Sequence, residues 1–215
     1  MMKTHAFRLL SLTGLLIFLI SSAHAEKMRG DNEHSRKWNK FADDVLALHY
    51  KLTKGKKGIE KKTSIGGYAT NKDFYNEEKF INKSNDQVIS TVQWERKNPK
   101  VMHFVEVNVL DNKGRIIRDY SAAYLPEYHN APTQTLINLH VYNGKLHAFR
   151  TYDAGGDRIG EQCSGKYKGK DFFLLLDEDE LYAAIDGNSD AMEQAEYKAC
   201  FKGLQEEVGK FIKPQ

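Results

Sequence analysis

The sequence predicts an α+β protein with an N-terminal helix, an antiparallel β-meander of about seven strands, and C-terminal helices. Between residue 66 and about residue 176, short runs rich in aromatic and β-branched residues alternate with turn residues, and helical periodicity fades. Strands that follow one another with no helix between them pair antiparallel. The pattern leaves two architectures open, an open curved sheet and a partial barrel.

The first element is a helix of about five turns that begins near Ser35. Apolar residues recur there at spacings of three and four, which places them on one buried face. That face comprises Trp38, Phe41, Ala42, Val45, His49 and Leu52. Gly55 and Gly58 end the helix. We interpret the lysine-rich segment 51–62 as a solvated connection, because no aromatic residue lies between its lysines.

The strand candidates are residues 74–81, 87–95, 101–110, 115–125, the two halves of 134–151, 158–163 and 172–176. Turn residues separate them, with a glycine closing the turns 111–114 and 153–156. Asn143-Gly144 is the strongest hairpin signal, since both central positions of a type I′ turn need positive φ. In that hairpin His140 would face His147, and Leu139, Val141, Leu146 and Ala148 would line the core face.

Four acids at 177–180 open a helix that Gly187 ends, because acidic residues suit a helix N-terminus. A longer helix is expected from about residue 190 to residue 212, with a break at Gly203.

The first 25 residues predict export. Lys3 and Arg8 precede an uncharged apolar run, and Ala23-His24-Ala25 matches the small-residue cleavage pattern. We therefore expect a signal peptide at 1–25, a flexible tail at 26–34, a single domain at 35–215, and a periplasmic location. No later stretch is long and apolar enough to span a membrane. Of 32 basic residues, 30 remain after cleavage against 29 acids, a net charge of +1 that gives no global argument for nucleic acid as a partner.

Cys163 and Cys200 are the only two cysteines in the sequence. An even count in an exported protein predicts a disulfide, and only one intramolecular pairing exists. We expect the bond to clamp the last helix onto the sheet.

The candidate metal ligands are His140 and His147, whose rings would point to the same side of the hairpin. Two imidazoles can hold a transition metal if a further ligand joins them, and His129 is the most movable candidate. The alternative is a polar sheet face on which the histidines have no ligand. His103 lies among valines and is interpreted as a core or edge residue. No other cofactor is indicated.

Tyrosines give the other candidate site. Tyr124, Tyr128 and Tyr142 lie in or beside the predicted sheet and can line a face for an apolar or sugar-like ligand or a partner protein. No nucleophile motif, phosphate loop or calcium loop is present, and the sequence does not decide whether any reaction is catalysed. The resulting hypothesis is a soluble, non-enzymatic binding module for a partner protein or small ligand, and the alternative is a metal-binding protein or metal-dependent enzyme that uses the His140/His147 face.

Overall fold

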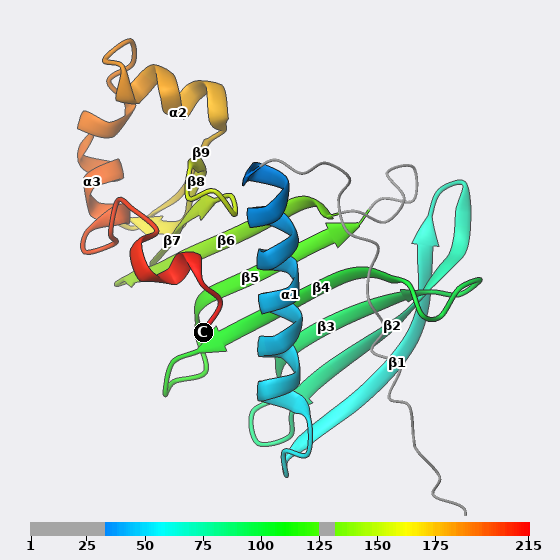
Figure 1. Ribbon diagram of the computed structural model, residues 1–215. Helices are drawn as coiled ribbons and strands as arrows, with labels where there is room; N and C mark the ends of the chain where they lie inside the picture. Colours follow the sequence, from blue (N-terminus) through cyan, green and yellow to red (C-terminus); the bar gives the residue numbers. More distant parts are fainter. Residues whose placement is uncertain (1–32, 125–131) are drawn as a thin grey trace, which may run out of the picture.

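The computed structural model describes residues 33–124 and 132–215. Nine strands form one antiparallel sheet in which neighbours in the chain are neighbours in space, so β1 and β9 are its two edges (Figure 1). The predicted α+β class is confirmed, and the sheet is open. The strands are β1 (Ile59–Tyr68), β2 (Asn71–Asn82), β3 (Gln87–Glu95), β4 (Met102–Leu110), β5 (Ile116–Tyr124), β6 (Pro132–Asn143), β7 (Leu146–Tyr152), β8 (Arg158–Tyr167) and β9 (Lys170–Leu176).

The sequence did not predict β1, which pairs with β2 along nearly its whole length. Its side chains are almost all exposed or half-buried, with lysines at positions 61 and 62. A strand at the edge of a sheet needs no alternating apolar pattern, because solvent covers both its faces. Part of the lysine-rich connection expected at 51–62 is therefore strand.

Helix α1 (Glu33–Thr53) crosses one face of the sheet over β3 to β6, and we call this the front face (Figure 1). The predicted apolar stripe is the contact surface, since Phe41, Ala42 and Val45 are buried against the sheet. Beneath them lie side chains that alternate along the central strands, including Val105, Val107, Tyr120, Ala122 and Ile137. Alternate residues of the same strands point to the opposite face, which we call the back face.

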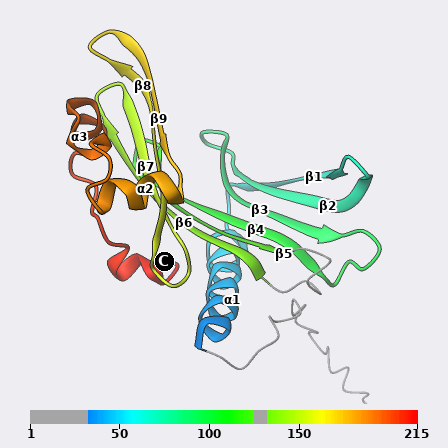
Figure 2. The same ribbon diagram turned by 90° about the horizontal axis from the view of Figure 1, so that it is seen from above.

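A second core holds the C-terminal helices against β7, β8 and β9, which turn away from the rest of the sheet in Figure 2. These helices are α2 (Glu178–Ile185) and α3 (Ala195–Phe201), joined by the 3-10 segment η2 (Ala191–Glu193) and followed by η3 (Gly209–Ile212). The predicted disulfide is present, with Cys163 of β8 bonded to Cys200 of α3. Within the described ranges, no helix has the length and apolarity that a membrane crossing requires.

The C-terminal helix is shorter than predicted. A helix from about residue 190 to residue 212 was expected, but α3 ends at Phe201 and only η3 follows. Gly203 has a φ of 79°, which a right-handed helix cannot contain. The predicted break at Gly203 is therefore the end of the helix.

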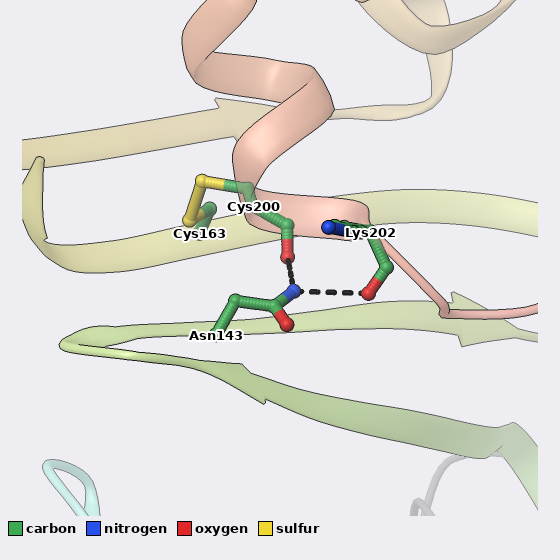
Figure 3. Close-up of a disulfide and its surroundings, with 4 residues drawn as sticks. All are labelled: Asn143, Cys163, Cys200 and Lys202. Carbon is green, nitrogen blue, oxygen red and sulfur yellow. Dashed lines mark hydrogen bonds between the residues drawn. A yellow bond between two sulfur atoms is a disulfide. The ribbon is translucent and has the colours of Figure 1, made fainter.

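The predicted register of the β6–β7 hairpin is wrong. Asn143 pairs with Leu146 inside the ladder, so Gly144 and Lys145 form the loop and His140 faces Phe149. Only Gly144 has positive φ, at 64°, whereas the predicted type I′ turn requires two such residues. Asn143 has another role, since its side-chain amide donates to the carbonyl oxygens of Cys200 and Lys202 at 2.9 and 3.0 Å (Figure 3). It binds two carbonyls at the end of α3, beside the disulfide.

Candidate functional site

The back face carries a buried polar cluster built on the two predicted histidines. Asp119 of β5 accepts from Nε2 of His140 at 2.6 Å, and Nδ1 of His140 lies 2.9 Å from Nε2 of His147. The side chains of His140 and Asp119 are 7% and 11% exposed, whereas His147 is half-buried. The shifted register makes the histidines diagonal neighbours, and both still project from the back face.

The two imidazoles meet edge to edge. Their ring centroids are 5.1 Å apart with planes 10° from parallel, while the facing nitrogens are only 2.9 Å apart. An ionised carboxylate only accepts, so Asp119 fixes the proton of His140 on Nε2. Nδ1 of neutral His140 is then an acceptor, and His147 donates to it from Nε2. Nδ1 of His147 is then the one ring nitrogen of the pair that carries no proton and takes no part in these two hydrogen bonds, and it belongs to the less buried histidine.

Further side chains hold this back-face histidine cluster in place. Asn138 donates to the second oxygen of Asp119 at 2.7 Å, and the hydroxyl of Thr151 donates to the Asn138 amide oxygen at 2.7 Å. Tyr142 stacks on His147 with centroids 4.5 Å apart, and the Arg115 guanidinium lies over the Tyr142 ring. Because strands β5, β6 and β7 all contribute, the cluster fixes the mutual register of these strands.

The surroundings of His147 disfavour its protonated form. Burial lowers the pKa of His147, and the neighbouring His140 lowers it further. Burial also raises the pKa of the Glu106 carboxyl on β4, with repulsion from Asp119 as the second cause. The hydrogen bonds form a continuous row from His147 through His140 to Asp119. In the described ranges, the hydrogen bonds of the two rings are those to each other and to Asp119.

The geometry does not favour the predicted metal site. Two imidazole nitrogens on a tetrahedral zinc would lie about 3.3 Å apart, farther than the hydrogen-bonded pair is now. Among residues 33–124 and 132–215, no three His, Cys, Asp or Glu side chains are arranged so that they could hold a metal ion. His129, the candidate third ligand, lies outside the described residues. Metal binding by His140 and His147 stays a prediction that titration can test.

The predicted tyrosines do not form one face. Tyr124 is 2% exposed and belongs to the core under α1, on the front face. Tyr142 projects from the back face beside His147, and Tyr128 lies outside the described residues. Tyr124 and Tyr142 therefore cannot line a common site. The predicted core or edge residue His103 is buried at the start of β4, where Tyr68 contacts its ring.

A buried ion pair that sequence analysis missed anchors the C-terminal segment. Arg150 of β7 donates to Glu161 of β8 at 2.6 Å, and both side chains are almost fully buried. The same guanidinium donates to the carbonyl oxygens of Leu204 and Gln205 at 2.8 Å. Arg158 also donates to the same oxygen of Glu161, at 3.2 Å. Because both members of the pair are buried and the guanidinium binds the backbone of the C-terminal segment, we assign this arrangement a structural role.

The second candidate surface is β9, the edge strand that follows the disulfide-bearing β8. Phe173 and Leu175 are 65% and 52% exposed, and both project from the back face because they pair with Ser164 and Gln162. In the part of the chain that the structure describes, β9 pairs with β8 alone. The run 172–176 predicts an apolar strand, but a run of this kind is equally typical of a buried central strand.

No protein-family model, curated protein or solved structure matches this chain. The back-face histidine cluster and β9 are the two surfaces of the described residues that bear on function.

Proposed function

We propose that the protein is an exported, non-enzymatic interaction module that takes an extended strand of a partner protein onto the free edge of β9. The observation that carries the proposal is the exposure of Phe173 and Leu175 on an edge strand. An edge strand presents a row of unpaired backbone donors and acceptors, and an added strand satisfies them. Apolar side chains at alternate positions would select the partner strand.

The contrast with the other edge supports a docking role for β9. Proteins protect sheet edges with charged side chains, especially lysine. Lys61 and Lys62 protect β1 in this way, whereas the run from Phe172 to Leu176 on β9 contains no charge. Because Phe173 and Leu175 are already partly covered, their complete burial would contribute less than the roughly 1.5 to 3 kcal/mol that a fully exposed side chain of this kind gains.

The framework behind β9 is rigid, which favours binding. The Cys163–Cys200 bond and buried Leu181 of α2 tie β8 and β9 to the C-terminal helices. Helix α2 itself begins with a capping box in which Asp177 and Glu180 bond each other's backbone amides. A preformed edge loses little conformational entropy when a partner strand pairs with it.

Export belongs to the same proposal. The basic start, apolar run and Ala-x-Ala sequence at the N-terminus favour cleavage after Ala25 and delivery to the periplasm. A disulfide is the covalent bond that an oxidising compartment stabilises. Fractionation of the producing cells should recover the processed protein outside the cytoplasm. Recovery of an unprocessed chain in the cytoplasm would contradict this part of the proposal.

Site-specific photocrosslinking in the producing cells tests the docking surface. A photoreactive phenylalanine analogue at position 173 should give an adduct with another protein, and Leu175→Lys on the same chain should abolish it. The matched control carries the analogue at Ile65, which is 56% exposed on the opposite edge. Absence of an adduct at position 173, or the same adduct from position 65, would overturn the proposal. An adduct made only of two copies of this chain would replace the partner protein with self-association.

A further inference from the structure

The sequence contains one Asn-Gly pair, Asn143-Gly144, and such a pair is chemically reactive. The backbone nitrogen that follows an asparagine can attack the asparagine side-chain amide, and glycine hinders this attack least because it has no side chain. Asn143 ends β6, and Gly144 begins the loop of the β6–β7 hairpin. The fold therefore places a candidate deamidation site at this loop.

Gly144 is open to the reaction. It is exposed and adopts a φ of 64°. Among the residues that the structure describes, and apart from its chain neighbours, no heavy atom lies within 4 Å of the position that a Cβ would occupy on Gly144. Solvent therefore reaches the residue whose backbone nitrogen is the nucleophile.

The Asn143 side chain, in contrast, is held by the end of α3. Its amide nitrogen donates to the carbonyl oxygens of Cys200 and Lys202 at 2.9 and 3.0 Å, and Figure 3 shows the amide pointing at both. Ring closure moves Cγ of Asn143 onto the Gly144 nitrogen, so the amide nitrogen must leave both acceptors. Loss of two hydrogen bonds of this kind slows the reaction on the order of tenfold or more.

The disulfide fixes one of these two acceptors. Cys200 is fully buried and bonded to Cys163 of β8, and its own carbonyl accepts from Asn143. Lys202, the other acceptor, follows two residues later in the chain. Loss of the disulfide would free the end of α3 to move away from the hairpin, and the Asn143 amide would then lose its acceptors.

From these contacts we propose that Asn143 is a deamidation site that the docked end of α3 protects, and that its conversion to aspartate detaches that end. The Gly144 nitrogen forms a bond to Cγ of Asn143 as its proton leaves, and the side-chain nitrogen departs as ammonia, which gives a cyclic succinimide. Water then opens the ring at one of its two carbonyls and yields aspartate or isoaspartate. The net reaction consumes water, releases ammonia and changes no oxidation state.

The product does not fit the place that the amide occupied. The last carbonyls of a helix have no partner within the helix, and Asn143 donates to two carbonyls at the end of α3. A carboxylate only accepts, so at position 143 it would face two carbonyl oxygens with no proton between them. Isoaspartate would also lengthen the backbone of the loop. The modification therefore marks chains in which α3 has opened, and it is independent of strand docking at β9.

Peptide mapping by mass spectrometry, on the full processed chain kept at mildly alkaline pH, measures the rate at Asn143. Three states are compared, namely the folded wild type, the folded double variant Cys163→Ser and Cys200→Ser, and the urea-denatured wild type. Circular dichroism verifies folding. If the double variant does not fold, Phe201→Leu replaces it, because Phe201 is buried at the end of α3.

We expect Asn143 to react on the order of tenfold or more slowly in the folded wild type than in the denatured chain, with the loosened variant between them. Gly144→Asp is the chemical control, since aspartate tolerates positive φ but its side chain hinders the attack, and it should slow the reaction in the denatured chain. Equal rates in the folded and denatured wild type, or in the folded wild type and the loosened variant, would overturn the protection by α3. A denatured chain in which Asn143 reacts no faster than Asn112 would overturn the site itself.

Urea denaturation of Asn143→Asp tests the detachment of α3. Its midpoint should lie below that of Asn143→Ala, because alanine removes the two hydrogen bonds without placing a carboxylate against the carbonyls. The matched control is Asn112→Asp, which makes the same change of charge in the exposed β4–β5 turn and should keep the wild-type midpoint. A midpoint of Asn143→Asp equal to or above that of Asn143→Ala would overturn the detachment.

Discussion

Protonation of His49 should weaken the docking of α1 in acid. His49 is 4% exposed and lies at the end of α1, with Nδ1 2.9 Å from the Ser90 hydroxyl of β3. That hydroxyl donates to the Glu106 carbonyl at 2.6 Å, so its own proton is used. His49 must therefore donate from Nδ1, so protonation would place the additional proton on Nε2. Burial lowers the pKa of His49 from 6.5 to about 4, with a smaller opposing effect from Glu78.

The sign and size of the effect follow from linkage. Below pH 6.5 His49 binds a proton in the unfolded chain but stays neutral in the folded protein until about pH 4. Protonation therefore stabilises the unfolded state, and the free energy of unfolding falls as the pH falls. The loss develops between pH 6.5 and about pH 4, the folded pKa. At about 1.4 kcal/mol per pH unit, His49 alone should cost the folded state about 3 kcal/mol over this range.

The assay is urea denaturation between pH 7 and pH 4 for the wild type and His49→Asn, whose amide can still donate to Ser90. The variant should lose about 3 kcal/mol less than the wild type over this range. His34→Asn is the matched control, since His34 lies on the exposed side of the same helix. Equal pH dependence of His49→Asn and the wild type would refute the argument that a buried neutral ring docks α1.

Three further predictions concern the disulfide, the helix contact and the histidine pair. The denatured, unreduced protein should label no thiols, and replacing Cys163 and Cys200 with serine should cost about 3 to 4 kcal/mol; two labelled thiols would contradict the bond. Phe41→Ala should cost about 3 to 5 kcal/mol in denaturation, and an unchanged midpoint would show that α1 does not dock. Calorimetric titration with zinc and copper should give equal heats of binding for the wild type and His140→Ala. A heat of binding that the wild type shows and His140→Ala lacks would instead support the metal hypothesis for His140 and His147.

Local chemistry made much of the fold predictable. The stripe from Trp38 to Leu52 indicates α1, since only a helix places those residues on one face. The Asp111–Gly114 turn was predictable because Gly114 adopts a φ of 77°, which glycine reaches without strain. Strand β1 was missed because an edge strand with two exposed faces leaves no alternation in the sequence.

The sequence predicted less of the two candidate surfaces than of the fold. The proximity of His140 and His147 followed from their hairpin, but the Asp119 carboxylate comes from β5, about 20 residues earlier, and no local pattern points to it. The register error had a physical source, since Asn143 binds the end of α3 instead of forming the turn. The edge position of β9 depends on which strand lies last in the sheet. A contiguous apolar run such as 172–176 does not contain that information.

The central claim, that a partner strand pairs with β9, is tested most directly by hydrogen exchange of the β9 backbone. In the isolated protein, the amides of β9 that point away from β8 should exchange rapidly, while those bonded to β8 should be protected. The measurement is repeated with the partner protein that crosslinking identified. The amides between Lys170 and Leu176 that point away from β8 should then exchange more slowly, while the exchange rates of the other edge strand, Ile59–Tyr68, should not change. Unchanged exchange in β9 on binding, or new protection confined to another element, would contradict the account.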